Sequence, residues 1–503
     1  MIITYIGQRA MMDLRLQLFR HLQRMAVAFF DRNPVGRLVT RLTNDVATLE
    51  MALSEGLVET LVNVLMLVAI IGVLLVLDFK LALVMLAVLP LLIYAVKRIA
   101  FAQRQGFREQ RGWLSRINAY LNENITGMAV VQLFNRQKRN LGHFDDRNQG
   151  LLAANLKVTF YYAVFEPVVV LFNAVTTGLV IWYGGGRVLD DSLTLGTLVA
   201  FLQYMQRFYW PIRDLSQRYT TLQQAMASSE RIFGVLDSPE EITDAEDAAE
   251  LTAIKGKIEF RNVWFAYDAE NWVLRDVSFV IQPGEKLAVV GATGAGKSTL
   301  MSLLNRFYDI QRGEILVDDV PIKRLRQRSL RRQVGLVLQD PFVFTDTIEE
   351  NIRMRDASIS LEAVHAAARL VGAESFILQT PDAYASVLAE RGANLSTGQK
   401  QLIALARVTA FNPGVVVVLD EATASIDPET EATIQRSIRQ VMEGRTSIII
   451  AHRLNTIRNV DRIIVLQHGR LVEEGTHAAL LAQRGTYFSL YELQYKDQDI
   501  AVP

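Results

Sequence analysis

The sequence predicts a helical membrane domain followed by a soluble α/β domain built around a phosphate-binding loop. Two uncharged stretches, 60–77 and 81–96, approach the length that crosses a bilayer. In the second half, the apolar run 286–290 leads into GATGAGKST at 291–299, which reads as a strand, a phosphate loop and a helix. A third observation is the apolar run 415–419, which is followed directly by two acids. This pattern is typical of a buried parallel strand that places carboxylates at the ligand-binding edge of its sheet.

Composition agrees with two kinds of domain. The 503 residues suit two or three domains, and half of them are hydrophobic although 21% are charged. The net charge is zero, so no basic field indicates a nucleic acid partner. The chain has no cysteine, which excludes disulfides and thiolate chemistry. The first ten residues lack the basic region of a signal peptide and resemble the tail of a longer element.

Four membrane spans are predicted from apolar stretches separated by polar turns, and the first two stretches contain no charged residue. Buried soluble hairpins are the alternative interpretation. The segments 9–50 and 97–157 are rich in Arg and Lys, so the positive-inside rule makes them cytoplasmic, and we expect long helices there. The predicted spans are about 60–77, 81–96, 158–183 and 193–215.

Domain boundaries follow from the same reading. The fourth membrane helix is expected to continue to about residue 236 and to close a domain of residues 1–236. An acidic linker, 237–253, is expected to be a solvated joint. The soluble domain is predicted for 254–495, with a tail at 496–503.

The phosphate loop offers the most specific chemistry. Its glycines let backbone N–H groups surround phosphates at a helix N-terminus. Lys297 is expected to reach the terminal phosphates, and the Ser298 hydroxyl to ligate Mg²⁺. The remaining loop residues predicted to contact nucleotide are Gly291, Thr293, Gly294, Ala295, Gly296 and Thr299.

Polar residues at three other strand ends are catalytic candidates. Asp420 is expected to hold Mg²⁺ through water, and Glu421 to polarise the attacking water. His452 follows the apolar run 446–451 and is a donor candidate for the γ-phosphate. Gln339 ends another apolar run and is a candidate Mg²⁺ or water contact. The alternative for all of them is an exposed polar strand end.

The order of these pieces, together with Leu395-Ser-Thr-Gly-Gln399 before a helix, resembles the ABC ATPase family. The resemblance implies that Ser396, Gly398 and Gln399 cap the nucleotide of a partner domain, so that two ATP molecules lie in a head-to-tail dimer. It further implies that Tyr267 stacks on adenine and that Asp427 belongs to a loop linking the two sites. An N-capped helix and a core-strand aromatic are the respective alternatives.

The first half is similar to the membrane domain of ABC exporters, whose coupling loops the segments 29–46 and 123–134 resemble. The details of the soluble half look closest to bacterial heterodimeric multidrug exporters of the Mdl type. The expected fold class is therefore an all-α transmembrane domain of the ABC exporter type followed by an α/β P-loop ABC ATPase domain. Because that family has six membrane helices, we expect the membrane domain to be incomplete through truncation at the N-terminus. Thr397 replaces the family's glycine, which favours a related, non-identical partner and leaves a homodimer open.

The resemblance implies ATP-driven export of amphipathic, drug-like or lipid-like molecules across the bacterial plasma membrane. ATP and Mg²⁺ are the expected cofactors, and the expected partners are a second half-transporter, membrane lipid and the substrate. Alternatives are a lipid flippase, an importer ATPase, an inactive truncated subunit, or a soluble ATPase acting on DNA or translation, which the apolar stretches disfavour. Glu166, near a span, is expected to contact either substrate or water.

Overall fold

The computed structural model describes residues 2–268, 271–338, 340–420, 428–451 and 457–494. These residues form two compact units. The first contains residues 1–21 and 36–238, and the second contains 22–35 and 239–503. The segment 22–35 therefore packs with the second unit although it lies near the start of the chain.

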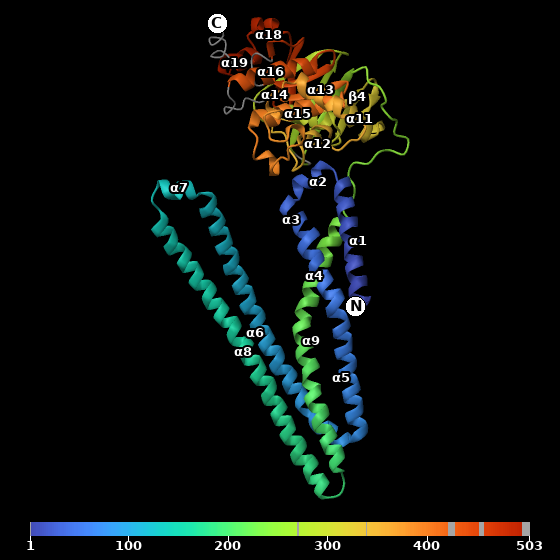
Figure 1. The fold of residues 1–503 in the computed structure, drawn as a ribbon, viewed down its shortest axis with the longest axis vertical. Helices are drawn as coiled ribbons and strands as arrows, with labels where there is room; N and C mark the ends of the chain where they lie inside the picture. The colour runs from blue at the N-terminus through green and yellow to red at the C-terminus, as the bar shows by residue number, and fades with distance from the viewer. Residues whose placement is uncertain (1, 269–270, 339, 421–427, 452–456, 495–503) are drawn as a thin grey trace. The chain divides into compact units, whose positions relative to one another are not determined.

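The first unit consists of long helices (Figure 1). Helices α6 and α8 run side by side and are joined through the short α7, while α9 lies along α5. Two short π-helical turns, η1 and η2, interrupt the helical run that leads into α5. The bounds are α1 Ile2–Arg24, α3 Val35–Thr40, η1 Arg41–Asp45, α4 Val46–Met51, η2 Ala52–Gly56, α5 Leu57–Leu77, α6 Phe79–Thr126, α7 Met128–Leu133, α8 Gln137–Leu189 and α9 Leu195–Leu236.

Polar side chains start and join these helices. The Asp78 carboxylate accepts a hydrogen bond from the Leu81 N–H at 2.8 Å and so caps the N-terminus of α6. Arg187, near the end of α8, donates to both oxygens of the same carboxylate at 2.7 Å. Asp78 therefore caps α6 and also connects the turn between α5 and α6 to the end of α8. The Glu166-Pro167 pair does not interrupt α8, which is continuous, and Glu166 is exposed on it.

Within the described residues, three helical runs are long and apolar enough to cross a membrane: 35–77, 79–126 and 137–189. They contain the first three predicted spans. The fourth predicted span, 193–215, lies on α9, which is not among the three. Gln203, Gln206 and Arg207 interrupt the apolar residues of that stretch and lower its hydropathy.

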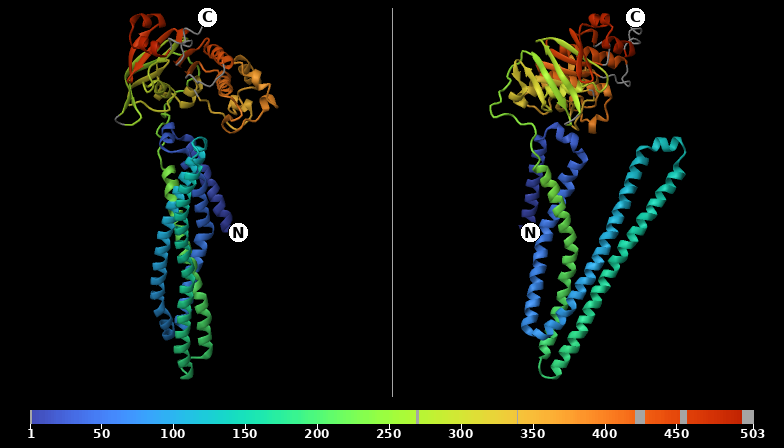
Figure 2. Two further views of the ribbon diagram at one scale, coloured as in Figure 1. Left: turned by 90° about the vertical axis from the view of Figure 1, so that its left-hand side faces the viewer. Right: turned by 180° about the vertical axis from the view of Figure 1, so that it is seen from behind.

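The second unit contains two sheets (Figure 2). An antiparallel sheet has the order β2-β1-β4-β5, and a six-stranded sheet has the order β10-β9-β3-β8-β7-β6. In the larger sheet β9, β3, β8, β7 and β6 are parallel, and β10 pairs antiparallel at one edge. The strands are β1 Ile258–Ala266, β2 Trp272–Ile281, β3 Lys286–Val290, β4 Arg312–Val317, β5 Val320–Pro321, β6 Val334–Val337, β7 Val415–Asp420, β8 Thr446–Ala451, β9 Arg462–Gln467 and β10 Arg470–Gly475.

The helices of this unit are short compared with those of the first. The α-helices are α2 Val27–Arg32, α10 Lys297–Leu304, α11 Gln327–Gln333, α12 Ile348–Arg353, α13 Leu361–Leu370, α14 Glu374–Ile377, α15 Thr397–Phe411, α16 Pro428–Met442, α18 His477–Gln483 and α19 Thr486–Gln494. Three 3₁₀ turns accompany them: η3 Ile322–Arg324, η4 Ala383–Ala385 and η5 Glu390–Gly392. The predicted class of a helical domain followed by an α/β domain is confirmed.

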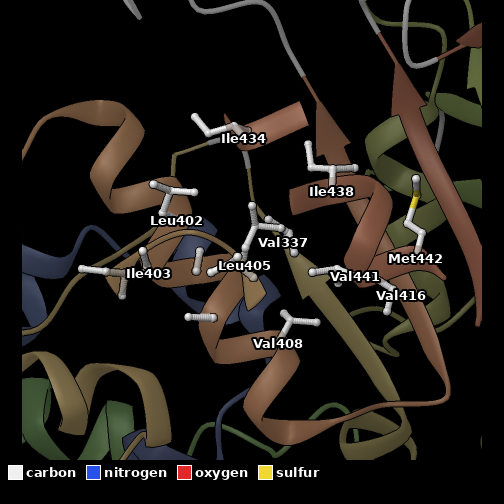
Figure 3. Close-up of a cluster of buried hydrophobic side chains, with 14 of the residues drawn as sticks. Val337, Leu402, Ile403, Leu405, Val408, Val416, Ile434, Ile438, Val441 and Met442 are labelled. Atoms are coloured by element: carbon white, nitrogen blue, oxygen red, sulfur yellow. The ribbon is translucent and has the colours of Figure 1, made fainter. Parts of the chain in front are cut away.

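Both faces of the six-stranded sheet are buried. Along β7, Val416 faces one hydrophobic core while Val415 and Val417 face another. The first core lies against α15 and α16, where Figure 3 shows Leu405 and Val441 close to the sheet. The second core lies between the two sheets and includes residues of α10. Successive side chains of a strand point to opposite faces of the sheet, and here both faces are buried. The strands of this sheet therefore appear in the sequence as unbroken hydrophobic runs.

The acidic linker 237–253 is mostly exposed, and part of it is also attached to the second unit. Its Asp244 carboxylate accepts a hydrogen bond from the Gln327 N–H at 3.0 Å, at the start of α11. Farther along, Ala249 pairs with the 324–326 backbone through two hydrogen bonds of 2.8 and 3.0 Å. Two acids of this segment, Asp244 and Glu250, also form ion pairs with Arg306 and Arg326, which composition alone did not reveal.

Candidate nucleotide-binding site

The loop between β3 and α10 has the geometry of a phosphate cradle. Gly296 precedes α10 with φ +100°, and a Cβ there would lie 2.6 Å from a Leu274 methyl carbon. A Cβ on Gly291 would lie 2.2 Å from the Leu466 carbonyl oxygen. Both positions therefore require glycine. The loop ends at a helix N-terminus, where unpaired N–H groups and the helix dipole favour an anion.

Lys297 is buried inside this loop. Its Nζ donates hydrogen bonds to the carbonyl oxygens of Gly291 at 2.6 Å and Ala292 at 3.0 Å. The ammonium group is thus held where phosphate oxygens can serve as alternative acceptors. Ser298, the next residue, is exposed in the first turn of α10, whereas Thr299 is buried. Thr293 and Gly294 are exposed in the loop, and Ala295 is buried.

Tyr267 lies beside the same helix. It follows the end of β1 and is 42% exposed, so it is not a core aromatic of a strand. Its hydroxyl is 3.1 Å from the Thr299 Oγ1. The rings of Phe265 and Tyr308 meet it edge-on, with centroids 4.8 and 5.0 Å away. These contacts fix the ring while leaving part of it open for stacking.

Three further parallel strands end at the edge of the sheet that carries the loop. β8 lies between β3 and β7, and β6 follows β7. Asp420, the last residue of β7, is paired with Ala451, the last residue of β8. The strands therefore deliver their carboxyl ends to one edge, as expected for a ligand site in an α/β sheet. Gln339, Glu421, Asp427 and His452 lie outside the described residues, as does the Asp420 side chain.

The segment 395–399, which is predicted to cap the nucleotide of a partner domain, lies at the N-terminus of α15. The Ser396 hydroxyl accepts from the Gln399 N–H at 3.2 Å, and the Gln399 side-chain oxygen accepts from the Ser396 N–H at 2.9 Å. This reciprocal pair is a capping box, so both side chains have a structural role in this unit. Ser396 and Thr397 are exposed and Gly398 is buried. Among the described residues, no hydrogen bond joins this segment to the phosphate loop.

Two family models match the chain. The model of the ABC transporter transmembrane region matches residues 1–212, and the ABC transporter model matches residues 274–424. The chain belongs to the ABC transporter family.

Individual ABC relatives match nearly the whole chain. YknV of Bacillus subtilis, an uncharacterized ABC transporter ATP-binding protein, is 41% identical over 98% of this chain and 82% of YknV. An ATP-dependent lipid A-core flippase of Syntrophus aciditrophicus is 36% identical over 99% of this chain and 83% of the flippase. The structure of a bacterial Atm1-family ABC exporter with ATP bound is similar with a TM-score of 0.79 and 29% identity, over 98% of this chain and 86% of that chain.

These matches confirm the predicted family and type of activity. The chain is a membrane protein of the ABC exporter type, and its second unit is an ATP-hydrolysing domain. Because ABC exporters work as dimers, it acts with a second half-transporter.

The loop of this ABC domain fits a nucleotide on its own geometry. Side chains larger than hydrogen are excluded at Gly291 and Gly296, a buried ammonium lies within the loop, and an exposed aromatic flanks the helix. A cavity of about 450 Å³ lies next to Tyr267 and is also lined by Asp31, Phe265 and Tyr308. The phosphate and base halves of ATP therefore each have a matching surface.

Sequence reasoning missed one aromatic of the ABC site. Tyr308 packs edge-on against Tyr267, and its hydroxyl donates to the Asp31 carboxylate of α2. Burial, together with this hydrogen bond, raises the pKa of Tyr308 above its ordinary value. The contact joins the predicted coupling segment 29–46 to the aromatic group beside the nucleotide loop. No short motif marks this pair, because its members lie 277 positions apart in the sequence.

Proposed function

We propose that this chain is one half of an exporter that moves amphipathic small molecules across the bacterial plasma membrane, with its ATPase unit on the cytoplasmic side. The observation that supports this most directly is the phosphate loop, in which Lys297 is buried against the Gly291 and Ala292 carbonyl oxygens beside the exposed Tyr267. A surface lysine after a tight turn would have no reason to be buried in this way. The proposed reaction is hydrolysis of ATP.

The proposed hydrolytic roles follow the family pattern and the common edge of the strands. Glu421 polarises the attacking water, and His452 donates to the γ-phosphate. Ser298, Gln339 and Asp420 would hold Mg²⁺, which supplies positive charge against the phosphate oxygens when bound. Phosphoryl transfer depends on such positioning and charge, so residues delivered to one sheet edge suit it.

The partner is proposed to be a related but non-identical chain. In this arrangement Ser396, Gly398 and Gln399 face the nucleotide held by the partner's phosphate loop, and Asp427 lies in the loop between the two sites. The exposed N-terminus of α15 supports the capping role, because it presents N–H groups to an anion. Thr397 places a side chain where the family usually has glycine, which weakens that one site and favours an asymmetric pair.

Transport is proposed to follow from closure of the two ATPase domains. ATP must bind the closed state more tightly than the open state, since equal affinity would shift nothing. The continuous helices α6 and α8 are suited to carry the motion, because neither is broken at its internal proline. We assign residues 1–236 to the membrane domain with four spans, including α9, 237–253 to the linker, 254–495 to the ATPase domain and 496–503 to a tail.

ATP hydrolysis by the chain in lipid vesicles, with and without its partner, tests this proposal. Lys297→Ala is expected to abolish both nucleotide binding and hydrolysis, whereas Glu421→Gln is expected to keep binding and lose hydrolysis by about 100-fold or more. Lys255→Ala, at an exposed lysine of the same unit, is the matched control and should behave as the unaltered protein. Equal hydrolysis by all four proteins would refute the assigned site.

The same vesicles separate the two substrate classes. An exporter of small amphiphiles accumulates a fluorescent amphiphile in inverted vesicles, whereas a lipid flippase, as the relative from Syntrophus aciditrophicus is named, moves a labelled lipid between leaflets. Full hydrolysis by the chain alone would contradict the non-identical partner. Absence of hydrolysis with every partner tested would contradict the proposed function itself.

A further inference from the structure

The segment 342–347 follows β6 in the sequence, but it is attached to the helices beside the larger sheet. Val343 is buried in the hydrophobic core that lies against α15 and α16. The Asp346 carbonyl oxygen accepts a hydrogen bond from the Leu388 N–H at 2.9 Å. In the sequence, Gln339 lies between β6 and this segment. The segment therefore sets one end of the short stretch of chain that carries Gln339.

Asn351 of α12 holds the backbone of this segment. It is 1% exposed. Its Oδ1 accepts from the Phe344 N–H at 2.8 Å, and its Nδ2 donates to the carbonyl oxygens of Phe344 and Thr347, each at 3.0 Å. Asparagine is a weak helix former, so α12 gains no helical stability from it. The use of both groups of the amide indicates that the side chain serves the segment and not the helix.

Arg407 connects the same backbone to α15. Its Nε donates to the Asn351 carbonyl oxygen at 2.9 Å, and its Nη2 donates to the Phe342 carbonyl oxygen at 3.3 Å. Among the residues that the structure describes, no carboxylate forms an ion pair with Arg407, and burial lowers the pKa of its guanidinium below the ordinary value. Removing a cation from water without a counter-charge is costly. The two bonds to backbone oxygens are therefore the structural reason for an arginine at this position.

We propose that Asn351 and Arg407 are positioning residues for ATP hydrolysis, because together they fix the segment 342–347 to α15. The inference rests on the proposed function, in which Gln339 serves the nucleotide of this chain and Ser396 serves the nucleotide of the partner. Ser396 caps α15, and Arg407 lies eleven residues later, about 16 Å along the axis of the same helix. The two residues thus connect the chain beside one nucleotide to the helix that caps the other.

Variants of the full chain in lipid vesicles test the proposal, under the conditions in which the unaltered protein hydrolyses ATP. Arg407→Met keeps the length of the side chain and removes its donors, and Asn351→Leu keeps the volume and removes the amide. Each is expected to lower kcat by about tenfold or more. The Kd of trinitrophenyl-ATP is expected to stay within about twofold, because the phosphate loop is unchanged. Arg407→Lys keeps the charge and a donor, and its kcat is expected to be intermediate.

The matched control is Arg439→Met, which removes an exposed arginine of α16 and should leave kcat unchanged. An equal loss in this control overturns the inference, and so does an unchanged kcat in Arg407→Met or Asn351→Leu. A Kd that weakens as much as kcat falls shows a general loss of structure and overturns it as well. The double variant is expected to be no slower than the slower single variant, because either change already releases the segment. Losses that multiply show two independent effects and overturn the common role.

Hydrogen exchange separates this inference from the proposed function. Peptides that cover 342–347 in the full chain are expected to exchange about tenfold faster in Arg407→Met and Asn351→Leu than in the unaltered protein. If the unaltered protein hydrolyses no ATP with any partner, the proposed function fails, and the exchange rate still decides whether these two residues hold the segment. An unchanged exchange rate overturns the inference whatever the hydrolysis shows.

Discussion

The two units use the same apolar side chains in opposite ways. In the ATPase unit, the valines of β7 from 415 to 417 are 0% exposed. In the helical unit, Val68 and Val76 of α5 are 64% and 87% exposed. Water drives the first arrangement, because burying apolar area is favourable only when the alternative is water. A helix surrounded by lipid has no such driving force between its neighbours.

The helical unit is correspondingly joined by polar contacts at a few positions. Arg187 donates a hydrogen bond to Asp78, and Asn63 of α5 donates to Asp214 of α9. Arg231 of α9 donates to the buried Asp45 of η1. The ATPase unit has two continuous hydrophobic cores on the faces of one sheet, whereas the buried apolar residues of the helical unit form one smaller cluster among α5, α6, α8 and α9. Polar pairs should therefore carry a larger share of the stability in the helical unit than in the ATPase unit.

The largest expected effect of a single substitution is in the sheet core. Leu405→Ala removes a side chain that is 1% exposed on α15, and the cavity left behind should lower the free energy of unfolding of the ATPase unit by about 2–5 kcal/mol. Hydrogen exchange of α15 and β7 peptides in the full chain measures this. Leu370→Ala, at an exposed leucine of α13, is the control and should cost less than about 0.5 kcal/mol. Similar losses for both variants would contradict a core formed by these helices.

The second prediction tests which solvent surrounds the exposed valines. Val68→Asp places a charge in the middle of α5, where it should cost about 2.5–3.5 kcal/mol of membrane insertion if lipid surrounds that face. Val472→Asp, on the edge strand β10, exposes a similar group to water and should cost no more than about 1 kcal/mol of stability. The fraction of α5 inserted in a translocation assay measures the first value. Unchanged insertion of the Val68→Asp chain would mean that water reaches this face.

Sequence reasoning worked where a pattern is local. The phosphate loop requires glycines and a lysine within nine residues, and buried parallel strands leave unbroken apolar runs, so 286–299 and 415–420 could be placed from the sequence. Charge-free stretches likewise indicate helices that lipid can surround. Of the four predicted spans, three lie on helical runs of the described residues that are long and apolar enough to cross a membrane.

Contacts between distant residues could not be predicted in that way. Acids and turn residues predicted an exposed linker, but they did not predict that Asp244 would meet the start of α11, about eighty residues away in the sequence. The same holds for Tyr308 and Asp31, which lie 277 positions apart in the sequence. Periodicity shows that a face is apolar or basic, and it does not show which other face meets it.

The smallest expected effect concerns the buried pair of the helical unit. Asp45 accepts hydrogen bonds from Arg231 at 2.6 and 3.0 Å and from Ser228 at 2.9 Å. Asp45→Asn keeps the volume and removes the charge. Since Arg231 is half exposed to solvent, the expected loss is about 1–2 kcal/mol, measured by hydrogen exchange of α4 and the end of α9. The control is Asp13→Asn in an exposed pair with Arg9, which should change little.

At low pH, the stability difference between the unaltered protein and Asp45→Asn should disappear. The hydrogen bond from Arg231 is the main cause that holds the pKa of Asp45 below its ordinary value of 3.8. A depressed folded pKa means that the stabilisation is complete above the unfolded pKa and disappears as the pH falls through the folded one. The difference between the two proteins should therefore stay constant from pH 7 to about 4 and shrink below that. A difference that shrinks already between pH 7 and 5 would show that another group, and not this carboxylate, holds η1 against α9.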